Sequence, residues 1–455
     1  MIDIARNIAL EVLYKMDESG AYSNIALDDM LKNNRKALSD RDVSLISQIV
    51  YGVTTWKLTL DEIIKKYSSI KLKKISIWII NILRMGIYQI IFLDKIPKSA
   101  AVNECVNLAK RYGHKASSGF VNAILRKVSP DDYLQLFDVK LPKAEMISKT
   151  QSMPLWIIEE LLENNTIEEV EEICKNLNLT PCVSIRVNNV KTTKKELEEI
   201  FNKNSIQYEE GELDDFLILN KAKNIENIEG FKEGLFTVQD ESAGLTCLVL
   251  NPKEGQMVLD ACSAPGGKTT YMAEIMKNTG NIIAWDVYEH RINLINENAN
   301  RLGLKNINTS INDASIYNEN YKEKFDKILL DVPCLGIGVI RRKPDIKWQR
   351  KQEDVYEISK LQYKILETCS KYLKPGGELV YSTCSILKKE NEDVILKFLE
   401  NNKDFEIKKL DSNKWNEYIK EEKYFSIKPD KKHDGFFICK LHKNNIKILL
   451  QKCYI

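Results

Sequence analysis

Two cysteines follow predicted buried strands, each beside turn-forming residues. Cys334 follows the strand-like run DKILLDVP (326–333), and Cys384 directly follows GELVYST (377–383). Most free cysteines are small buried hydrophobes, and we expect that structural role for the cysteines without such a context: Cys105, Cys174, Cys182, Cys247, Cys369, Cys439 and Cys453. Ligands of an open α/β sheet bind beyond the carboxyl ends of its strands. Cys334 and Cys384 are therefore expected to face one crevice, where a thiolate can act as a nucleophile.

A loop with paired glycines follows the predicted strand MVLDAC (257–262). Its residues are Cys262, Ser263, Ala264, Pro265, Gly266, Gly267 and Lys268. A phosphate-binding P-loop needs a glycine where Cys262 stands, and the dinucleotide fingerprint G-x-G-x-x-G is absent. Glycines ahead of a helix still let a ligand approach the backbone closely. A nucleoside-binding loop is the interpretation that remains.

Acidic residues end the next two predicted strands. Asp286 closes NIIAWD (281–286), 20 residues after Gly266, and its carboxylate can accept hydrogen bonds from a ribose diol. Asp313 closes INTSIND (307–313) and is placed to lie beside a base. One such acid alone would more simply be a helix cap or turn residue. Three successive strand ends with suitable residues favour a nucleoside ligand.

Three modules are expected to position these residues. Residues 1–140 show apolar residues at helical spacing and predict an all-α bundle. Residues 150–235 mix strand-like and helical runs and predict a small α+β module, whereas 236–445 alternate strands and helices, which is typical of a Rossmann-like α/β domain with a mostly parallel sheet. Charge differs between the segments: 1–127 carries 20 basic and 12 acidic residues, and 151–230 carries 8 and 17.

Overall composition excludes several classes of protein. The 455 residues are 44% hydrophobic and 29% charged, a globular balance. A net charge of +2 excludes a uniformly basic coat but not a local basic patch. No apolar run reaches the ~20 residues that a membrane helix needs, and no signal peptide is recognisable. Ten cysteines without a CxxC pair and four histidines argue against a disulfide framework and against a metal site. We expect a cytoplasmic protein.

Several motifs resemble those of RNA cytosine-5 methyltransferases that use S-adenosylmethionine. They are DACSAPGGKTT, DVPCLGIGVIRRKPDIKW, YSTCSILKKENE, VQDESAG and DGFFICKL. The run IPKSAAVNECVNLAKRYGHKASSGFVNAILRKV (96–128) is similar to part of the NusB RNA-binding fold. A NusB-like module joined to such a catalytic domain is the arrangement of the RsmB (Sun, Fmu) subfamily, and this resemblance spans nearly the whole chain.

The resemblance implies a role for each motif residue. It assigns the nucleophile that adds to C6 of cytosine to Cys384, and product release to Cys334. Asp331 would hydrogen-bond the base and lie close to the cofactor, while Lys268 would either lower a thiol pKa or hold its loop. S-adenosylmethionine would lie over residues 262–268, with its ribose on Asp286 and its adenine beside Asp313. No metal is implied.

RNA contacts are expected from the basic segment RRKPDIKWQRK (341–351), which follows the Cys334 loop. The alternative is an ordinary solvated loop, but the adjacent catalytic motif and the tryptophan favour phosphate contact and base stacking. The candidate residues here are Arg341, Arg342, Lys343, Lys347 and Trp348. The resemblance adds Arg186, at a family position near substrate RNA.

The expected function is methylation of C5 of a cytosine in 16S rRNA. The substrate would be free or early-assembly rRNA, and the enzyme a monomer without membrane or metal partners. Two alternatives stay open: methylation of another rRNA cytosine or of tRNA, and a non-catalytic NusB-like RNA-binding protein.

Overall fold

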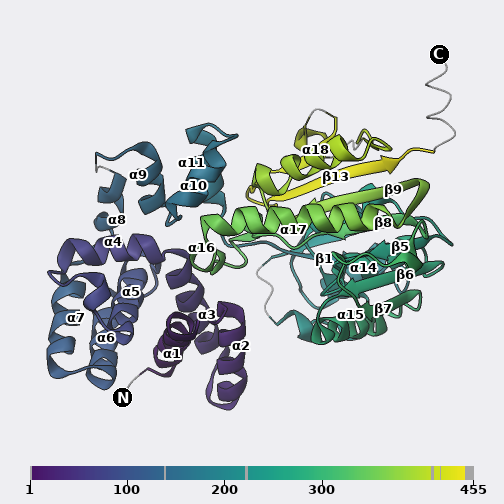
Figure 1. Cartoon of the computed structure of the whole chain (residues 1–455). Helices are drawn as coiled ribbons and strands as arrows, with labels where there is room; N and C mark the ends of the chain where they lie inside the picture. Colours follow the sequence, from purple (N-terminus) through teal and green to yellow (C-terminus); the bar gives the residue numbers. More distant parts are fainter. Residues whose placement is uncertain (1–2, 138–139, 221–223, 411–414, 421, 446–455) are drawn as a thin grey trace. The chain divides into compact units, whose positions relative to one another are not determined.

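The structure is a computed structural model that describes residues 3–137, 140–220, 224–410, 415–420 and 422–445. The chain divides into two compact units (Figure 1). The helical unit comprises Met1–Leu179 and, from far along the sequence, Ile340–Lys351. The sheet unit comprises Thr180–Val339 and Gln352–Ile455.

Amphipathic helices build the helical unit, as the apolar spacing predicts. They are α1 (Ile4–Ser19), α2 (Ser23–Asn34), α3 (Asp40–Thr55), α4 (Lys57–Tyr67), α5 (Ile77–Phe92), α6 (Lys98–Tyr112), α7 (Lys115–Lys127), α8 (Asp131–Leu134), α9 (Lys143–Thr150), α10 (Leu155–Leu162), α11 (Ile167–Asn176) and α16 (Ile346–Gln349). Ser39 and Asp42 form a capping box that fixes the start of α3. The most apolar of the long helices, α5, is buried over most of its length and forms the centre of the core.

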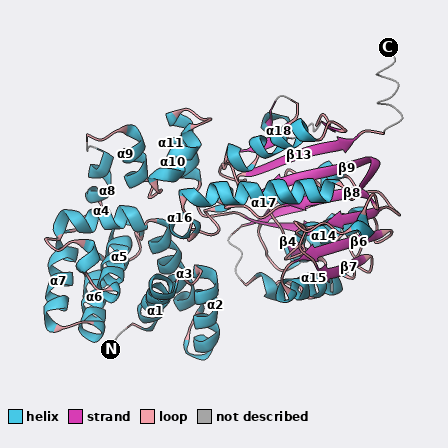
Figure 2. Cartoon of the chain, in the orientation of Figure 1, coloured by secondary structure: helices cyan, strands magenta, loops and turns pink. Residues whose placement is uncertain are grey.

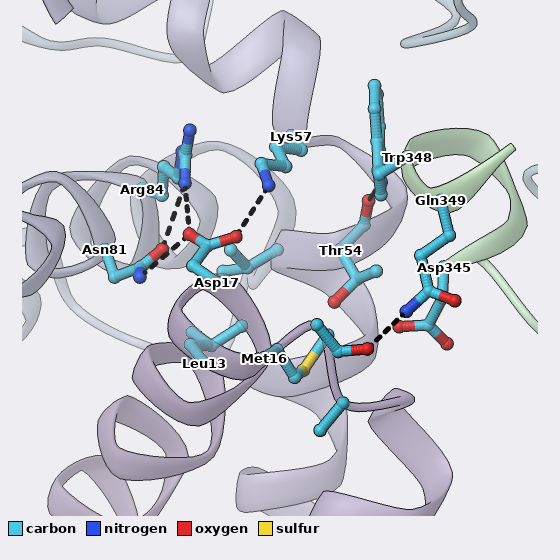
Figure 3. A pocket seen from close by; sticks show the side chains of 13 residues that line it. Leu13, Met16, Asp17, Thr54, Lys57, Asn81, Arg84, Asp345, Trp348 and Gln349 are labelled. Atoms are coloured by element: carbon cyan, nitrogen blue, oxygen red, sulfur yellow. Dashed lines mark hydrogen bonds and ion pairs between the residues drawn. The ribbon is translucent and has the colours of Figure 1, made fainter. Parts of the chain in front are cut away.

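One charged side chain of α5 is buried together with its partners. Arg84 donates to Asp17 at 2.9 Å (Figure 3). It also donates to Asp61 at 2.7 Å. Asp17 also accepts from Lys57 and Asn81. Because each charge has a partner, the unit tolerates an arginine in its core.

The segment 340–351 is built into the helical unit, which the sequence did not predict. Asp345 accepts hydrogen bonds from the backbone and hydroxyl of Ser23, and the indole N–H of Trp348 donates to the Thr54 carbonyl at 2.7 Å. Asp345, Trp348 and neighbouring helices line a pocket of about 220 Å³ (Figure 3). The side chain of Lys347 is 1% exposed and donates to the Thr55 carbonyl and to the Asn178 amide oxygen.

The buried Lys347 makes a testable contribution to stability. Burial lowers the pKa of its ammonium group to about 7, well below the value of an unfolded chain. Between these two values the unfolded chain binds more protons than the folded one, so the stability due to this residue must rise with pH, by up to about 1.4 kcal/mol per pH unit. Lys347→Met is expected to remove this rise.

Denaturant unfolding between about pH 7 and pH 9 measures this effect as the difference between wild type and Lys347→Met. Lys343→Met is the matched control, because Lys343 is an exposed lysine of the same segment. Parallel stability curves for wild type and Lys347→Met would show that Lys347 does not titrate in this range.

A small antiparallel sheet begins the sheet unit. Its strands are β1 (Val183–Val187), β2 (Tyr208–Glu210), β3 (Phe216–Leu219) and β4 (Phe236–Val238), in the order β2-β3-β1-β4. Helix α12 (Lys194–Lys203) starts at a capping box of Thr193 and Glu196, and its Leu197 and Phe201 pack against the sheet. This is the α+β module that the mixed pattern predicts.

The large sheet, magenta in Figure 2, has nine strands among the described residues. They are β5 (Met257–Asp260), β6 (Asn281–Asp286), β7 (Ile307–Ile311), β8 (Phe325–Asp331), β9 (Leu373–Thr383), β10 (Phe405–Ile407), β11 (Ile419–Lys420), β12 (Tyr424–Ile427) and β13 (Phe436–Lys443). The order is β11-β12-β13-β9-β8-β5-β6-β7, with β10 paired to β13. Strands β5 to β9 are parallel, which confirms the predicted mostly parallel sheet.

Helices cover both faces of the large sheet. They are α13 (Glu241–Leu250), α14 (Gly267–Ile275), α15 (Glu289–Leu302), α17 (Gln352–Ser370) and α18 (Glu392–Asn401). Alternate residues of β8 enter two different cores: Ile328 and Leu330 pack with residues of α17 and α18, and Leu329 packs with residues of α13 and α14. The direction of strand succession reverses between β5 and β8, the topological switch point where such folds bind ligands.

Candidate active site

The two cysteines predicted to share a crevice are in contact. Strands β8 and β9 pair in parallel with Asp331 opposite Ser382, so the loops that follow them start side by side. Cys334 Sγ and Cys384 Sγ lie 3.0 Å apart, and both side chains are half-buried. Two thiols from separate loops therefore form one contacting pair.

The two thiols are not equivalent. The hydrogen bond to Cys384, burial, and the nearby carboxylates of Glu390 and Asp331 raise the pKa of Cys334 well above its usual value. The raised pKa favours the protonated form of the Cys334 thiol.

Asp331 and Lys268 form an ion pair at the edge of this centre. Lys268 Nζ lies 2.7 Å from Asp331 Oδ2, and the hydroxyl of Ser382 donates to Asp331 Oδ1 at 2.9 Å. Burial opposes the charge of Lys268, but the Asp331 carboxylate outweighs it and raises the pKa of the lysine. Lys268 therefore stays charged, and its charge also acts on Cys384.

A buried carboxylate that the sequence analysis did not single out joins the two cysteine loops. Glu390 is fully buried and accepts from the backbone N–H of Leu335 at 2.9 Å, in the loop of Cys334. It also accepts from the hydroxyl of Ser385, next to Cys384, and from Gln362 of α17. The sequence did not indicate this role, because Glu390 belongs to the charged run LKKENE and such runs are usually exposed to solvent.

Close backbone packing holds the same loops from the other side. The N–H of Gly338 donates to the Cys384 carbonyl at 3.0 Å, and the N–H of Gly435 donates to the Gly338 carbonyl at 2.9 Å. A Cβ on Gly338 would lie 2.2 Å from the carbonyl oxygen of Gly435. The contact therefore requires glycine at 338.

The glycine loop after β5 is held between the start of α14 and the end of β6. Gly266 has φ +100°, a left-handed conformation that suits glycine, and it places α14 directly after the loop. The backbone N–H and hydroxyl of Ser263 both donate to the Trp285 carbonyl at 2.8 Å, which ties the loop to the end of β6.

Asp286 and Asp313 lie at the ends of neighbouring strands, as predicted. Asp286 is 7% exposed; its Oδ1 accepts from the Tyr288 N–H at 3.1 Å and its Oδ2 lies 3.8 Å from Arg291. Asp313 follows β7 and accepts from the Ser315 N–H at 2.8 Å. Both acids thus have the turn role expected of a strand-end residue, and Asp286 directly follows Trp285, whose carbonyl holds Ser263.

Comparison with known proteins decides the family. The model of the 16S rRNA methyltransferase RsmB/F matches residues 247–442, the NusB family model matches 3–130, and a ferredoxin-like domain of RsmF/B-like methyltransferases matches 153–226. A Bacillus subtilis protein described as a probable ribosomal RNA small subunit methyltransferase B is 37% identical over 443 residues, which cover 96% of this chain and 98% of that protein. The chain belongs to the RsmB/F family.

Solved structures agree with this assignment. The crystal structure of PH0851 superposes with a TM-score of 0.80 and 26% identity, covering 97% of this chain and 100% of that one. A methyltransferase homolog from Pyrococcus horikoshii covers 67% of this chain and 99% of its own, with 31% identity and a TM-score of 0.59. The all-α NusB domain, the ferredoxin-like module and the methyltransferase fold are thereby established as the architecture of this RsmB/F member.

The structure corrects part of the expected RNA surface of this RsmB/F protein. Arg186 is fully buried: its guanidinium pairs with Glu274 at 2.7 Å and donates to the Gly267 carbonyl at 3.0 Å, so it supports the start of α14 rather than RNA. Lys347 is equally buried, and Arg341 is 7% exposed. These three side chains turn inward because their partners lie in the protein, which a lone sequence does not show.

The other residues predicted to bind RNA are at least partly exposed to solvent. Lys343 is exposed, while Arg342 and Trp348 are half-buried, the latter with its N–H bound to Thr54.

Of the cysteines expected to be structural, Cys105, Cys174, Cys247, Cys369 and Cys439 are buried and Cys182 is half-buried; Cys453 lies outside the described residues. Within the described part of the chain, no helix has the length and apolarity to cross a membrane, and no group of three or more His, Cys, Asp or Glu side chains is arranged to hold a metal ion.

Proposed function

We propose that this protein transfers a methyl group from S-adenosylmethionine to C5 of a cytosine in 16S rRNA, through a covalent adduct on Cys384. The observation that carries the proposal is the 3.0 Å contact between two thiols beside the Asp331–Lys268 pair. C5 of cytosine is a weak nucleophile. Addition of a thiolate to C6 makes the ring an enamine whose C5 can take the methyl group, which is covalent catalysis.

Each residue of the centre has a part in this chemistry. Cys384 adds to C6, with Cys334 in contact beside it. After methylation the proton on C5 must leave for the adduct to break down, and the contact of Cys334 with Cys384 suits it to assist that elimination. Asp331 would hydrogen-bond the polar edge of the base and stabilise the charge that develops there as the adduct forms. Lys268 keeps Asp331 in place.

The residues present fit S-adenosylmethionine. The loop 262–268 would hold the cofactor at the start of α14, and the nearly buried carboxylate of Asp286 suits the two ribose hydroxyls. Asp313, at the end of the next strand, would contact the adenine. When bound, the cofactor supplies an electrophilic methyl group. Arg186 and Ser263 contribute by fixing the loop, through Gly267 and the Trp285 carbonyl.

The choice of 16S rRNA rests on the relatives and on the NusB-like domain. Exposed basic residues of the helical unit supply phosphate contacts that are not sequence-specific: Lys71, Lys73, Lys74, Lys110, Arg111 and Lys115. Lys343 and Arg342 extend this set. A non-catalytic RNA-binding protein would have no need for two thiols in contact, so the enzyme is favoured over it. Another rRNA or tRNA cytosine is the second candidate, because the same catalytic residues would serve it.

Bisulfite sequencing of rRNA and tRNA from a strain lacking this protein tests the proposal. One cytosine of 16S rRNA is expected to lose its protection from deamination, and purified protein with S-adenosylmethionine is expected to restore it. Loss of protection in tRNA or in another rRNA instead would replace the substrate, and unchanged protection everywhere would reject the methyltransferase function.

Glu390 should prove important as a positioning residue. Glu390 accepts hydrogen bonds from both cysteine loops. In Glu390→Gln one of the two accepting oxygens is replaced by an NH₂ group, which donates, so the hydrogen bond to one loop is lost and the two sulfurs should move apart. A displacement of about 1 Å can cost about 100-fold in rate. We expect a fall in kcat of that order with unchanged affinity for S-adenosylmethionine, measured by steady-state kinetics and calorimetry.

Asp393→Asn is the matched control for Glu390→Gln, because Asp393 is an exposed acid three residues away. It is expected to retain wild-type turnover. Equal kcat for both variants would show that Glu390 does not position the thiols.

A further inference from the structure

The contact between the two cysteines has a consequence beyond methyl transfer. A disulfide has an S–S distance of about 2.05 Å, so sulfurs at 3.0 Å need to approach by only about 1 Å. Both loops are held by Glu390 and by the Gly338 backbone, which keeps the sulfurs adjacent. Unlike the five fully buried cysteines, both are half-buried, which leaves them within reach of a small neutral oxidant.

We propose that Cys334 and Cys384 are a reversible oxidation site at which a peroxide converts the pair into a disulfide. Only the effect on activity rests on the proposed function: the disulfide would remove both the nucleophile and the thiol that assists release. Methyl transfer would then stop until a dithiol reduces the pair. The RNA-free enzyme is the sensitive form, since a base bound to Cys384 occupies that sulfur.

The chemistry balances with peroxide as the oxidant. The Cys384 thiolate attacks one peroxide oxygen, the O–O bond breaks, hydroxide leaves and a sulfenic acid forms. The Cys334 sulfur then attacks the Cys384 sulfur, the S–O bond breaks, and the hydroxyl group leaves with the thiol proton as water. In total the two thiols lose two electrons and two protons, and the peroxide becomes two molecules of water.

The surroundings favour this order of events. Lys268 lies close enough for its positive charge and a Cys384 thiolate to stabilise each other, which makes Cys384 the sulfur that peroxide oxidises first. Cys334 is in contact with it as the resolving thiol, so the sulfenic acid is captured before further oxidation.

Hydrogen peroxide treatment of the full-length protein tests the inference without measuring methylation. After denaturation and alkylation, the oxidised protein is expected to show two fewer free thiols than the reduced protein, with peptide mapping joining Cys334 to Cys384. Dithiothreitol should restore both thiols. Methyl transfer should fall in proportion to the disulfide formed and return on reduction.

Matched variants decide between this site and unspecific oxidation. Cys334→Ser and Cys384→Ser should each fail to form the link, and Cys384 in Cys334→Ser should proceed to sulfinic acid. Cys182→Ser, which removes a half-buried cysteine of the small module, should still form it. A fully alkylatable pair, sulfinic acid in the wild type, or a link to any other cysteine would overturn the proposal. A Cys334–Cys384 link in a protein that methylates no RNA would leave the oxidation site standing and reject the proposed function instead.

Discussion

Cys384→Ala is expected to abolish methyl transfer, and Cys334→Ala to leave the enzyme covalently bound to its RNA. Without Cys384 nothing adds to C6, and the loss of a nucleophile costs roughly 10⁴-fold or more in turnover. Without Cys334 the adduct can still form, but the group placed to help remove the C5 proton is gone. The 3.0 Å separation explains how one sulfur can act on an adduct carried by the other.

Denaturing gel electrophoresis after incubation with substrate RNA and S-adenosylmethionine distinguishes the two roles. A shifted protein–RNA band is expected for Cys334→Ala, and no such band for Cys384→Ala or for the double variant. Cys182→Ala is the control for removal of a half-buried thiol and should turn over normally. A stable adduct with Cys384→Ala instead would exchange the two assignments.

The methyltransferase core could be predicted from the sequence because parallel strands buried on both faces are continuous apolar runs. NIIAWD corresponds to β6 residue for residue. The antiparallel strands β10 to β12 were missed, because they are short and carry charged or polar residues between the apolar ones, as in KYFSIK. Strands β10 and β12 acquire their structure from pairing with β13, and β11 from pairing with β12, contacts that no local pattern shows.

Some residues of the candidate site could likewise be predicted from the sequence, and others could not. Strand ends converge by topology, so the strand pattern was enough to bring Cys334, Cys384 and Asp286 to one edge of the sheet. Glu390 could not be found in this way, because its burial arises from packing against Leu335 and Gln362, which lie far away in sequence.

The segment 340–351 shows that the burial of charged residues cannot be predicted reliably from the sequence alone. Lysine is almost never fully buried, so a run such as RRKPDIKWQRK favours a solvated or RNA-binding surface. In the structure Lys347 and Trp348 satisfy carbonyl groups of the helical unit instead. The chain therefore leaves the sheet unit six residues after Cys334 and returns at Gln352, the start of α17.

Asp286→Ala is expected to weaken binding of S-adenosylmethionine strongly and to leave RNA affinity unchanged. Each hydrogen bond to a charged group contributes about 1.5–3 kcal/mol, so loss of one ribose contact corresponds to about 10- to 100-fold in Kd and loss of two to more. The side chain is 7% exposed at the carboxyl end of β6, where a ligand over the loop of Ser263 can reach it.

Titration calorimetry with S-adenosylmethionine measures this effect, and two further variants separate it from damage to the fold. Asp286→Asn keeps an acceptor for the Tyr288 N–H but loses the charge, so its Kd should fall between those of wild type and Asp286→Ala. Glu289→Ala removes an exposed acid three residues along, in the first turn of α15, and should bind like wild type. Because the Asp286 carboxylate already holds a turn, a purely structural role would lower the thermal midpoint of Asp286→Ala without changing Kd. That outcome would remove Asp286 from the cofactor site.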